Sequence, residues 1–549
     1  METKGTNRWW PLHGRGLENF GVDGSYVTAP LPAVGDGEIL ARVEAATLCA
    51  SDAKMVRLGE DYPLFGNRDL AADPACLGHE LSLAVEVTRA GLAGVGPGTR
   101  LGVQPDLYTG GVRHCIGVDV TGGFADYILL GHNVMETDGG PMAFTVPPEI
   151  GRAATAMLEP LACVEGTFRL WGRSSLLEGG RLAVIAGEGT RDWRLDLPAP
   201  PDRVDLFGLS ESRFRAIAGG LGAADLRVDP AELQPQYDDV VVLGAADPDR
   251  IGALFDRLAD RGTFTWLAPG ETAADVPIDL AHFHYSKLVL RGAPTLSLAE
   301  ALARPIRCGY RPGGTTLIYG ASGAMGRFHL ERALGHPAGP ARVVALARRR
   351  DRLDRLVDEL RPLADEHGRA LEAIAIEDVD FANRLARFGG DRGFDEAIVV
   401  APEAEAFAAA RHLVAADGLL VGFAGTRKGD RVPAPLGRLA GGLSITASSG
   451  STVADQHEVI DRIARGELRA ERHVAAVTGL AGLRDGIAAL IDGRFTGKIL
   501  LLPSVDWPLL SIDELLVRYP ELAPLAEAGK YWSKEMEDRI LGPVGSGGA

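Results

Sequence analysis

The sequence predicts an α/β protein, in which a mainly β N-terminal domain precedes two tandem, doubly wound parallel sheets. Two observations lead to this prediction. Between Gly35 and Tyr127, short β-branched runs are broken by glycine, which is typical of a compact β domain. After Glu159, strand-like runs alternate with helix-like stretches, and the same order then appears a second time.

The expected domain boundaries follow these changes of pattern. Residues 1–165 form the N-terminal domain, which residues 450–505 complete, and residues 166–300 and 310–449 form the two α/β units. Residues 506–549 form a C-terminal tail that is too aromatic for a disordered linker, with Trp507, Tyr519, Tyr531 and Trp532. We expect this tail to pack on the body of the protein or on a second subunit.

The composition narrows the class of protein. A net charge of −17 disfavours binding to nucleic acid and to anionic membranes. No apolar run approaches the length of a membrane span, and the N-terminus has no hydrophobic signal core, so a cytoplasmic location is expected. The cysteines are odd in number and irregularly spaced, which predicts reduced thiols: Cys49, Cys76, Cys115, Cys163 and Cys308.

Individual elements can be assigned from the same patterns. In the N-terminal domain the strand candidates are Ile39–Val43, Leu81–Val87 and Gly123–Leu130. In the first unit they are Leu182–Ala186, Val204–Phe207, Val240–Leu243, Phe264–Leu267 and Leu288–Leu290, with a helix over Arg250–Asp260. In the second they are Thr316–Tyr319, Val343–Ala347, Ala397–Val400, Leu419–Gly422 and Leu443–Ala447. Beyond these, Asp455–Ala464 and Leu480–Leu490 predict helices, and Gly497–Leu502 a closing strand.

A glycine loop marks the second unit as a dinucleotide-binding Rossmann-like domain. Strand Leu317–Tyr319 runs into Gly320-x-x-Gly323-x-x-Gly326 and then into a helical run over Arg327–Leu334. Glycines allow the tight turn and the close approach of a pyrophosphate, whose charge meets the helix N-terminus. The expected cofactor-binding residues of this loop are Gly320, Ser322, Gly323, Ala324, Met325 and Gly326.

The first unit has lost this signature. After Ile185-Ala186 comes Gly187-Glu188-Gly189-Thr190, and the stretch where the helix should follow holds Pro198, Pro200 and Pro201. Prolines break a helix, and Glu188 would repel a phosphate. We interpret the first unit as a degenerate copy with a structural or oligomeric role.

The residues after the next strand indicate which nicotinamide cofactor is bound. An NAD-specific domain carries an acidic residue there for the ribose diol, whereas this chain has Arg348, Arg349 and Arg350 after Ala347. Arginines suit a 2′-phosphate, so NADP(H) is favoured over NAD(H). The alternative is an ordinary solvated start to a helix over Asp351–Leu360.

Three short segments carry the residue types of a catalytic zinc site. They are Cys49-Ala50-Ser51-Asp52, Gly78-His79-Glu80 and Glu159-Pro160-Leu161. Thiolate, imidazole and carboxylate hold Zn²⁺ while leaving a position open for a substrate oxygen. Together with a dinucleotide loop, such a site indicates hydride transfer at an alcohol or carbonyl carbon.

These segments resemble the zinc-dependent medium-chain dehydrogenase/reductase superfamily, which contains alcohol, sorbitol and threonine dehydrogenases. The similarity covers Thr47–Asp52, Leu77–Glu80, Gly122–Tyr127, Glu159–Cys163 and the glycine loop. It implies a GroES-like N-terminal domain. Three features are most similar to the L-sorbose-1-phosphate reductase-like branch. They are the glycine loop followed by His329-Leu330-Glu331, the segment Ser448-Ser449-Gly450-Ser451, and the Trp-containing tail. Because only Cys115 lies between Gly98 and Gly122, no structural zinc is predicted, and a duplicated Rossmann unit exceeds the usual pattern.

The resemblance implies roles for individual residues. Cys49, His79 and Glu159 are the expected zinc ligands, although Cys163 could replace Glu159, and Glu80 could coordinate during exchange of water and substrate. Ser51 is expected to pass a proton from the substrate oxygen, and Asp52 to orient His79. The ordinary alternatives are a loop-capping hydroxyl and a surface carboxylate.

The sequence thus predicts a zinc-dependent oxidoreductase that transfers hydride between NADP(H) and a polyol or keto sugar, sugar phosphates included. A homo-oligomer, dimer or tetramer, is also expected, with a small-molecule substrate as the partner. Two alternatives stay open: a zinc-free alkene or quinone reductase of the same superfamily, and a non-catalytic nucleotide-binding scaffold. The second Rossmann copy is expected to supply the cofactor to Cys49 and His79.

Overall fold

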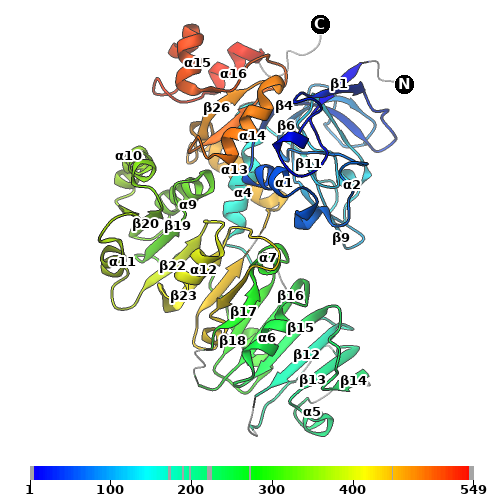
Figure 1. Cartoon of the computed structure of the whole chain (residues 1–549), viewed down its shortest axis with the longest axis vertical. Helices are drawn as coiled ribbons and strands as arrows, with labels where there is room; N and C mark the ends of the chain where they lie inside the picture. Colours follow the sequence, from blue (N-terminus) through cyan, green and yellow to red (C-terminus); the bar gives the residue numbers. More distant parts are fainter. Residues whose placement is uncertain are drawn as a thin grey trace. The chain divides into compact units, whose positions relative to one another are not determined.

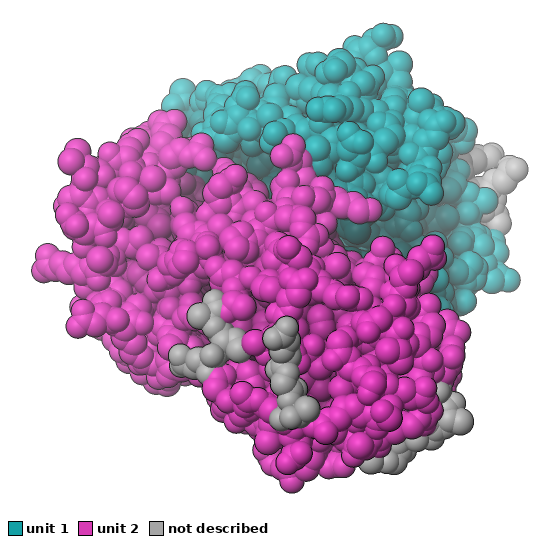
Figure 2. All heavy atoms as spheres, turned by 60° about the horizontal axis from the view of Figure 1, so that its bottom comes forward, with its two compact units in different colours: residues 1–166, 450–549 teal, residues 167–449 magenta. Residues whose placement is uncertain are grey.

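The structure, a computed structural model, describes residues 5–170, 173, 175–187, 191–196, 200–218, 225–270, 274–447 and 449–542. The chain divides into two compact units (Figure 2). Unit 1 comprises Met1–Gly166 and Gly450–Ala549, and unit 2 comprises Thr167–Ser449. Among the described residues, no helix has the length and apolar character needed to cross a membrane.

Unit 1 is built on an eight-stranded sheet of order β11-β7-β6-β4-β27-β26-β28, with β10 also paired to β4. Figure 1 labels β4, β6, β11 and β26 of this sheet. Its N-terminal strands are β4 (Ile39–Thr47), β6 (Glu80–Thr88), β7 (Arg100–Val103), β10 (Tyr127–Leu130) and β11 (Ala143–Thr145). Its C-terminal strands are β26 (Val474–Thr478), β27 (Lys498–Leu501) and β28 (Leu510–Ser511). Because β27 pairs antiparallel with β4 at Leu500 and Thr47, residues after 450 extend the N-terminal sheet.

The helices of unit 1 are mostly short. They are α1 (Ala50–Leu58), α2 (His132–Met135), α3 (Arg152–Ala156), α4 (Leu158–Gly166), α13 (Val453–Ala464), α14 (Leu483–Ile491), α15 (Ile512–Arg518) and α16 (Lys534–Leu541). The tail belongs to this unit. Glu537 of α16 accepts hydrogen bonds from the backbone of Arg152 and Ala153 at the start of α3, so the tail caps a helix of the body.

Unit 2 contains two parallel six-stranded sheets with the same topology. The first has the order β14-β13-β12-β15-β16-β18 and the second β21-β20-β19-β22-β23-β25. In the first, the strands are β12 (Arg181–Ala186), β13 (Arg203–Phe207), β14 (Asp225–Val228), β15 (Tyr237–Leu243), β16 (Leu258–Leu267) and β18 (Val289–Ala293). In the second, they are β19 (Thr315–Tyr319), β20 (Arg342–Ala347), β21 (Ala370–Ala375), β22 (Phe394–Val399), β23 (Val414–Gly422) and β25 (Ser444–Ala447).

Helices flank both sheets of unit 2 (Figure 1). The first copy has α5 (Glu211–Ile217), α6 (Pro248–Phe255), α7 (Leu280–Tyr285) and α8 (Leu298–Ala303). The second has α9 (Ala324–Gly335), α10 (Arg350–Glu366), α11 (Phe381–Gly389) and α12 (Ala404–Ala410). The predicted fold class, a β-rich N-terminal domain with two Rossmann-like parallel sheets, is confirmed.

Several predicted elements differ in extent from the observed ones, and two of them show the physical reason. The strand expected over Gly123–Leu130 begins only at Tyr127, because Gly123 and Phe124 donate to the loop carbonyls of Gly78 and Leu77 instead of joining the sheet. The helix expected over Arg250–Asp260 ends at Phe255, since Leu258 pairs with Tyr237 and opens β16.

Candidate active site

Strand pairing in unit 1 brings the Cys49 and His79 loops together. In the antiparallel pair β4–β6, Thr47 lies opposite Glu80, so the end of one strand meets the start of the other. Cys49 follows β4 and is the N-cap residue of α1, and His79 immediately precedes β6. The register of the sheet therefore places a thiol and an imidazole on adjacent loops.

Cys49, His79 and Glu80 form a potential metal-ligand group. One ligand atom from each of the three lies within 4.8 Å of the others. Glu80 is fully buried, whereas Cys49 and His79 are partly exposed. Thiol, imidazole and carboxylate at this spacing are the donor types that a tetrahedral zinc site uses.

Asp52 lies behind the imidazole of His79. Its Oδ1 is 3.6 Å from His79 Nδ1, and its Oδ2 accepts from the Cys49 backbone at 2.8 Å. Burial lowers the pKa of His79, but the nearby Asp52 carboxylate, helped by Cys49, raises it well above its usual value. Asp52 thus orients the ring from the Nδ1 side and leaves Nε2 available to a metal. A metal-bound histidine usually has its other ring nitrogen held by such a carboxylate.

Ser51 lies on the Nε2 side of the same imidazole. Its Oγ is 3.5 Å from His79 Nε2, which places a hydroxyl next to the nitrogen that Asp52 does not engage. Asp52 and Ser51 therefore lie at opposite ring nitrogens of His79, Asp52 beside Nδ1 and Ser51 beside Nε2.

The carboxylate of Glu80 is held by two buried partners. Lys498 Nζ donates to its two oxygens at 2.5 and 2.8 Å, and the Thr47 hydroxyl donates to Oε2. Burial lowers the pKa of the Lys498 ammonium, but the Glu80 carboxylate has the larger effect, so this pKa is raised above its usual value. The ammonium and the hydroxyl thus hold the Glu80 carboxylate in a fixed orientation.

Glu159 is the second residue of helix α4 and is buried. The Cys163 thiol, one turn later, donates to Glu159 Oε1 at 3.0 Å. Burial raises the pKa of Glu159, with the nearby Glu80 carboxylate adding to the effect while His79 opposes it. Glu159 is therefore close enough to feel the charges of His79 and Glu80, although it lies outside the 4.8 Å group. Cys163 serves as its hydrogen-bond donor.

The residues present fit a metal ion. Asp52 Oδ1 is buried and has no hydrogen-bond partner, so its charge is left for the imidazole to balance. The donor set is soft and borderline, which favours zinc over magnesium or calcium. Such an ion also stabilises the thiolate form of Cys49.

Sequence reasoning missed Lys498 as a member of this site. The sequence predicts only a closing strand at this position, yet Lys498 is 3% exposed and paired with Glu80, 418 residues away. A single lysine opening the apolar run Ile499-Leu500-Leu501 was the available signal, because a buried ammonium needs a carboxylate.

In unit 2, the loop after β19 has the geometry of a dinucleotide-binding turn. Gly320 has φ +95°, and a Cβ there would lie 2.5 Å from the Ala401 nitrogen. A Cβ on Gly326 would lie 2.5 Å from the Ala321 oxygen, whereas one on Gly323 would meet nothing within 4 Å. The first and third glycines are thus needed by the fold, and the second faces open space at the N-cap of α9. This is where a pyrophosphate would approach.

The other predicted loop residues lie around the same turn. Ser322 is in the turn, and Ala324 and Met325 form the first turn of α9, all half-buried. Arg348 and Arg349 follow β20 and are exposed. Arg348 pairs with Glu403 at 3.1 Å and Arg349 with Asp351 at 2.7 Å, so a 2′-phosphate would compete with surface carboxylates.

Comparison with known proteins gives a family match and several distant relatives. Residues 35–137 match the alcohol dehydrogenase GroES-like domain. The chain is 29% identical over 245 residues to mannitol-1-phosphate 5-dehydrogenase of Aliivibrio fischeri, covering 42% of this chain and 57% of the relative. It is 27% identical over 240 residues to L-sorbose 1-phosphate reductase of Klebsiella pneumoniae, covering 42% and 56%. The chain thus spans less than two thirds of the length of these curated relatives.

The fold is also similar to that of solved structures. A putative zinc-binding dehydrogenase from Sinorhizobium meliloti, bound to NADP, superposes with a TM-score of 0.51 at 16% identity, covering 91% of this chain and all of that one. At this identity the likeness concerns the fold alone.

Proposed function

We propose that this chain, which belongs to the medium-chain dehydrogenase/reductase superfamily, transfers hydride between NADP(H) and a polyol or keto sugar with the help of zinc. An oxidoreductase of the alcohol dehydrogenase type follows from the family. The proposal adds three points to this: the zinc, the preference for NADP(H), and the substrate class, in which we include sugar phosphates.

The observation that carries the proposal is the grouping of Cys49, His79 and Glu80 with Asp52 behind the imidazole. In the proposed assignment, Cys49, His79 and Glu159 hold the metal. Glu80 keeps its bonds to Lys498 and Thr47 and adds negative charge beside it. A metal-ligating histidine needs a partner such as a buried carboxylate beside its other ring nitrogen, here Nδ1. A histidine that is only packed in the core does not need a carboxylate there.

The residues around the metal position have separate tasks. Asp52 holds the ring of His79, and Ser51, on the opposite side of that ring, is placed to hand a proton between the substrate oxygen and solvent. When bound, zinc supplies a Lewis acid and the nicotinamide supplies or accepts the hydride.

Cofactor binding is assigned to the loop from Gly320 to Gly326. Its support is the open space at Gly323 combined with the constrained backbone at Gly320 and Gly326. Arg348 and Arg349 are proposed to exchange their surface carboxylates for the 2′-phosphate, because guanidinium binds phosphate in a bidentate manner. The substrate class rests on the two sugar-phosphate relatives.

The test is a rate screen of polyols, keto sugars and their phosphates with NADP(H) and NAD(H), run beside metal analysis. We expect turnover with NADP(H), about one zinc per chain, and loss of both in Cys49→Ala. Cys308→Ala, which changes a cysteine of unit 2, is the matched control and should behave like the wild type. Metal-free protein that reduces activated alkenes or quinones would instead favour the zinc-free alternative.

A further inference from the structure

The two Rossmann copies of unit 2 contact each other through equivalent elements. In the first copy, β17 (Val276–Asp279) lies in sequence between β16 and β18, and in the second, β24 (Arg431–Ala434) lies between β23 and β25. These two strands pair with each other, antiparallel, in a sheet of their own. The contact therefore joins the same position of the two copies.

The register of this pair is self-complementary. Pro277 lies opposite Pro433, with Val276 opposite Ala434 and Ile278 opposite Val432. Both strands carry the dipeptide Val-Pro, so the prolines that correspond in the two copies are also the ones that meet. An interface in which a residue faces its own equivalent is centred on a twofold axis, as in a symmetric dimer.

Packing beside the strand pair is reciprocal. Helix α7, which follows β17, contacts β25 of the second copy, and the 3-10 turn Leu436–Leu439, which follows β24, contacts β18 of the first. β18 and β25 also touch each other. Each copy thus gives and receives the same contact, which is the property of an isologous interface.

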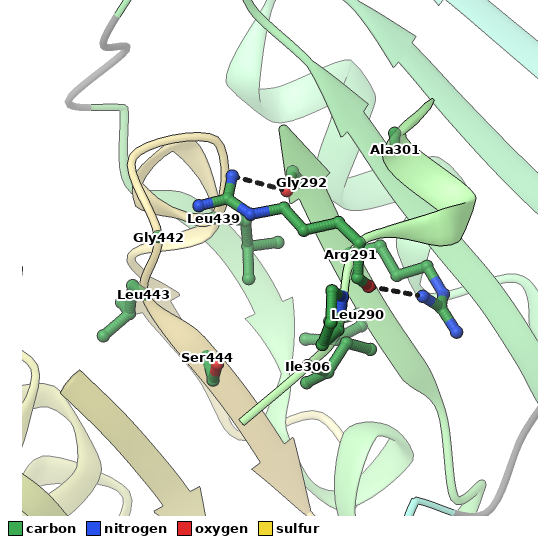
Figure 3. A pocket seen from close by; sticks show the side chains of 11 residues that line it. Leu290, Arg291, Gly292, Ala301, Ile306, Leu439, Gly442, Leu443 and Ser444 are labelled. Atoms are coloured by element: carbon green, nitrogen blue, oxygen red, sulfur yellow. Dashed lines mark hydrogen bonds between the residues drawn. The ribbon is translucent and has the colours of Figure 1, made fainter. Parts of the chain in front are cut away.

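The seam between the copies is closely packed and largely apolar. A single hydrophobic core holds residues of both copies, and Phe283 packs edge-on against Phe407 at 6.4 Å. At Gly292 of β18, a Cβ would lie 2.4 Å from the backbone carbon of Leu439. Figure 3 shows this region, where Leu290 and Gly292 from one copy and Leu439 and Leu443 from the other line a common pocket.

The first copy has kept the interface while losing the cofactor signature. Gly187 is retained, since a Cβ there would lie 1.8 Å from the Ala245 oxygen, just as one at Gly320 would meet Ala401. The later glycines of the motif are replaced in sequence, and Glu188, Gly189 and Thr190 lie outside the described residues. What the first copy preserves is thus its fold and its contact face.

We propose that the first copy is a built-in partner: it occupies, within one chain, the face through which the second copy would pair with another copy of this chain. The face formed by β24, the turn after it and β25 is then closed to a second molecule. Any assembly into dimers or tetramers has to use other surfaces.

Cysteine cross-linking at the centre of the pair tests this proposal. Pro277 is half-buried and Pro433 exposed, so cysteines there leave the buried face of the strands intact. Directly opposed residues of antiparallel strands lie about 4.5–5.5 Å apart at Cα, within reach of a disulfide. The disulfide is formed by adding a mild oxidant. If the geometry prevents disulfide formation, a short bismaleimide links the two cysteines instead.

The cross-linking products distinguish pairing of the two copies within one chain from pairing between two chains. We expect the double variant Pro277→Cys/Pro433→Cys to form a link within one chain, seen as a species of monomer mass on a non-reducing gel and as a 277–433 peptide pair. Pro433→Cys alone should form no link at 433, with the wild type as the control for its five native cysteines. A 433–433 link between chains, a 277–433 link between chains, or a double variant that cannot be linked would each overturn the proposal.

Discussion

Lys498 and Glu80 form a buried ion pair at the floor of the candidate metal site, with the ammonium 2.5 Å from one carboxylate oxygen and 2.8 Å from the other. Their exposed fractions are 3% and 0%. The pair joins β27 to β6, whose first residue follows the proposed ligand His79. A C-terminal strand thereby supports a site whose ligands come from the N-terminal part of the chain.

Removing one member of this pair should destabilise unit 1. Lys498→Met leaves the Glu80 carboxylate buried without its cation, at a cost of about 3–5 kcal/mol in the free energy of unfolding. The double variant Lys498→Met/Glu80→Gln should recover part of that loss, because no charge is left buried. Denaturant titration measures both. Equal losses in the single and double variants would show that the charge pairing is not what stabilises this region.

Asp52→Asn should weaken metal binding without unfolding the protein. The amide can still accept from the Cys49 backbone, but the negative charge facing His79 Nδ1 is gone. Loss of such an outer partner lowers metal affinity by about 10–100-fold. Competition with a zinc chelator measures the affinity, and Asp36→Asn, at an exposed position, is the control. An unchanged dissociation constant would remove Asp52 from the site.

The arginines after β20 should determine the choice of cofactor. Arg348→Ala and Arg349→Ala together should weaken NADPH binding by about 10-fold or more and leave NADH binding nearly unchanged, because only NADPH carries the 2′-phosphate. Arg355→Ala, further along α10, controls for the general loss of positive charge. Equal weakening of both cofactors would argue that these side chains do not recognise the 2′-phosphate.

Glu471 should make stability depend on pH. Burial raises its pKa to about 7, and the neighbouring carboxylates Glu537 and Glu527 add to the effect. Because this pKa is higher in the folded than in the unfolded chain, the folded state holds a proton that the unfolded state releases. This contribution to the free energy of unfolding therefore falls between pH 4.5 and 7, by up to about 3 kcal/mol.

The variant Glu471→Gln isolates this contribution. Denaturant titrations at several pH values should give a flatter profile between pH 5 and 7 than the wild type shows. If the two profiles run parallel, the ionisation of Glu471 is the same in the folded and unfolded chains.

The glycine loop allows fold and binding to be separated. Gly320→Ala should lower the melting temperature, since it forces φ +95° on alanine and places a Cβ against Ala401. Gly323→Ala should melt like the wild type, because its Cβ meets no atom, yet bind NADPH at least about 10-fold more weakly by filling the approach of the pyrophosphate. Unchanged NADPH affinity in Gly323→Ala would place the cofactor elsewhere.

The predictions from sequence succeeded where the signal is local. The strands of both parallel sheets are marked by apolar runs, and the relation of Gly320, Gly323 and Gly326 is contained in seven consecutive residues. The motif flanking Cys49 and the motif flanking His79 could be found because each lies beside a strand end. These features need no knowledge of distant contacts.

The features that escaped prediction depend on partners far along the chain. Lys498 and Glu80 are 418 residues apart, and Glu537 caps α3 from 384 and 385 residues away. The pair β17–β24 was missed because each strand is only four residues long and contains a proline, which argues against a strand in isolation. Only its distant partner makes each segment extended.

In the proposed function, activity requires both a metal held at Cys49 and a cofactor bound at the loop around Gly323. The most direct measurement is the steady-state rate of NADPH-dependent carbonyl reduction in Cys49→Ala and Gly323→Ala, with zinc content and NADPH affinity determined on the same samples. We expect that both variants lose activity, that Cys49→Ala keeps NADPH binding, and that Gly323→Ala keeps its zinc. A Cys49→Ala protein that reduces substrate at the wild-type rate would contradict the proposed function.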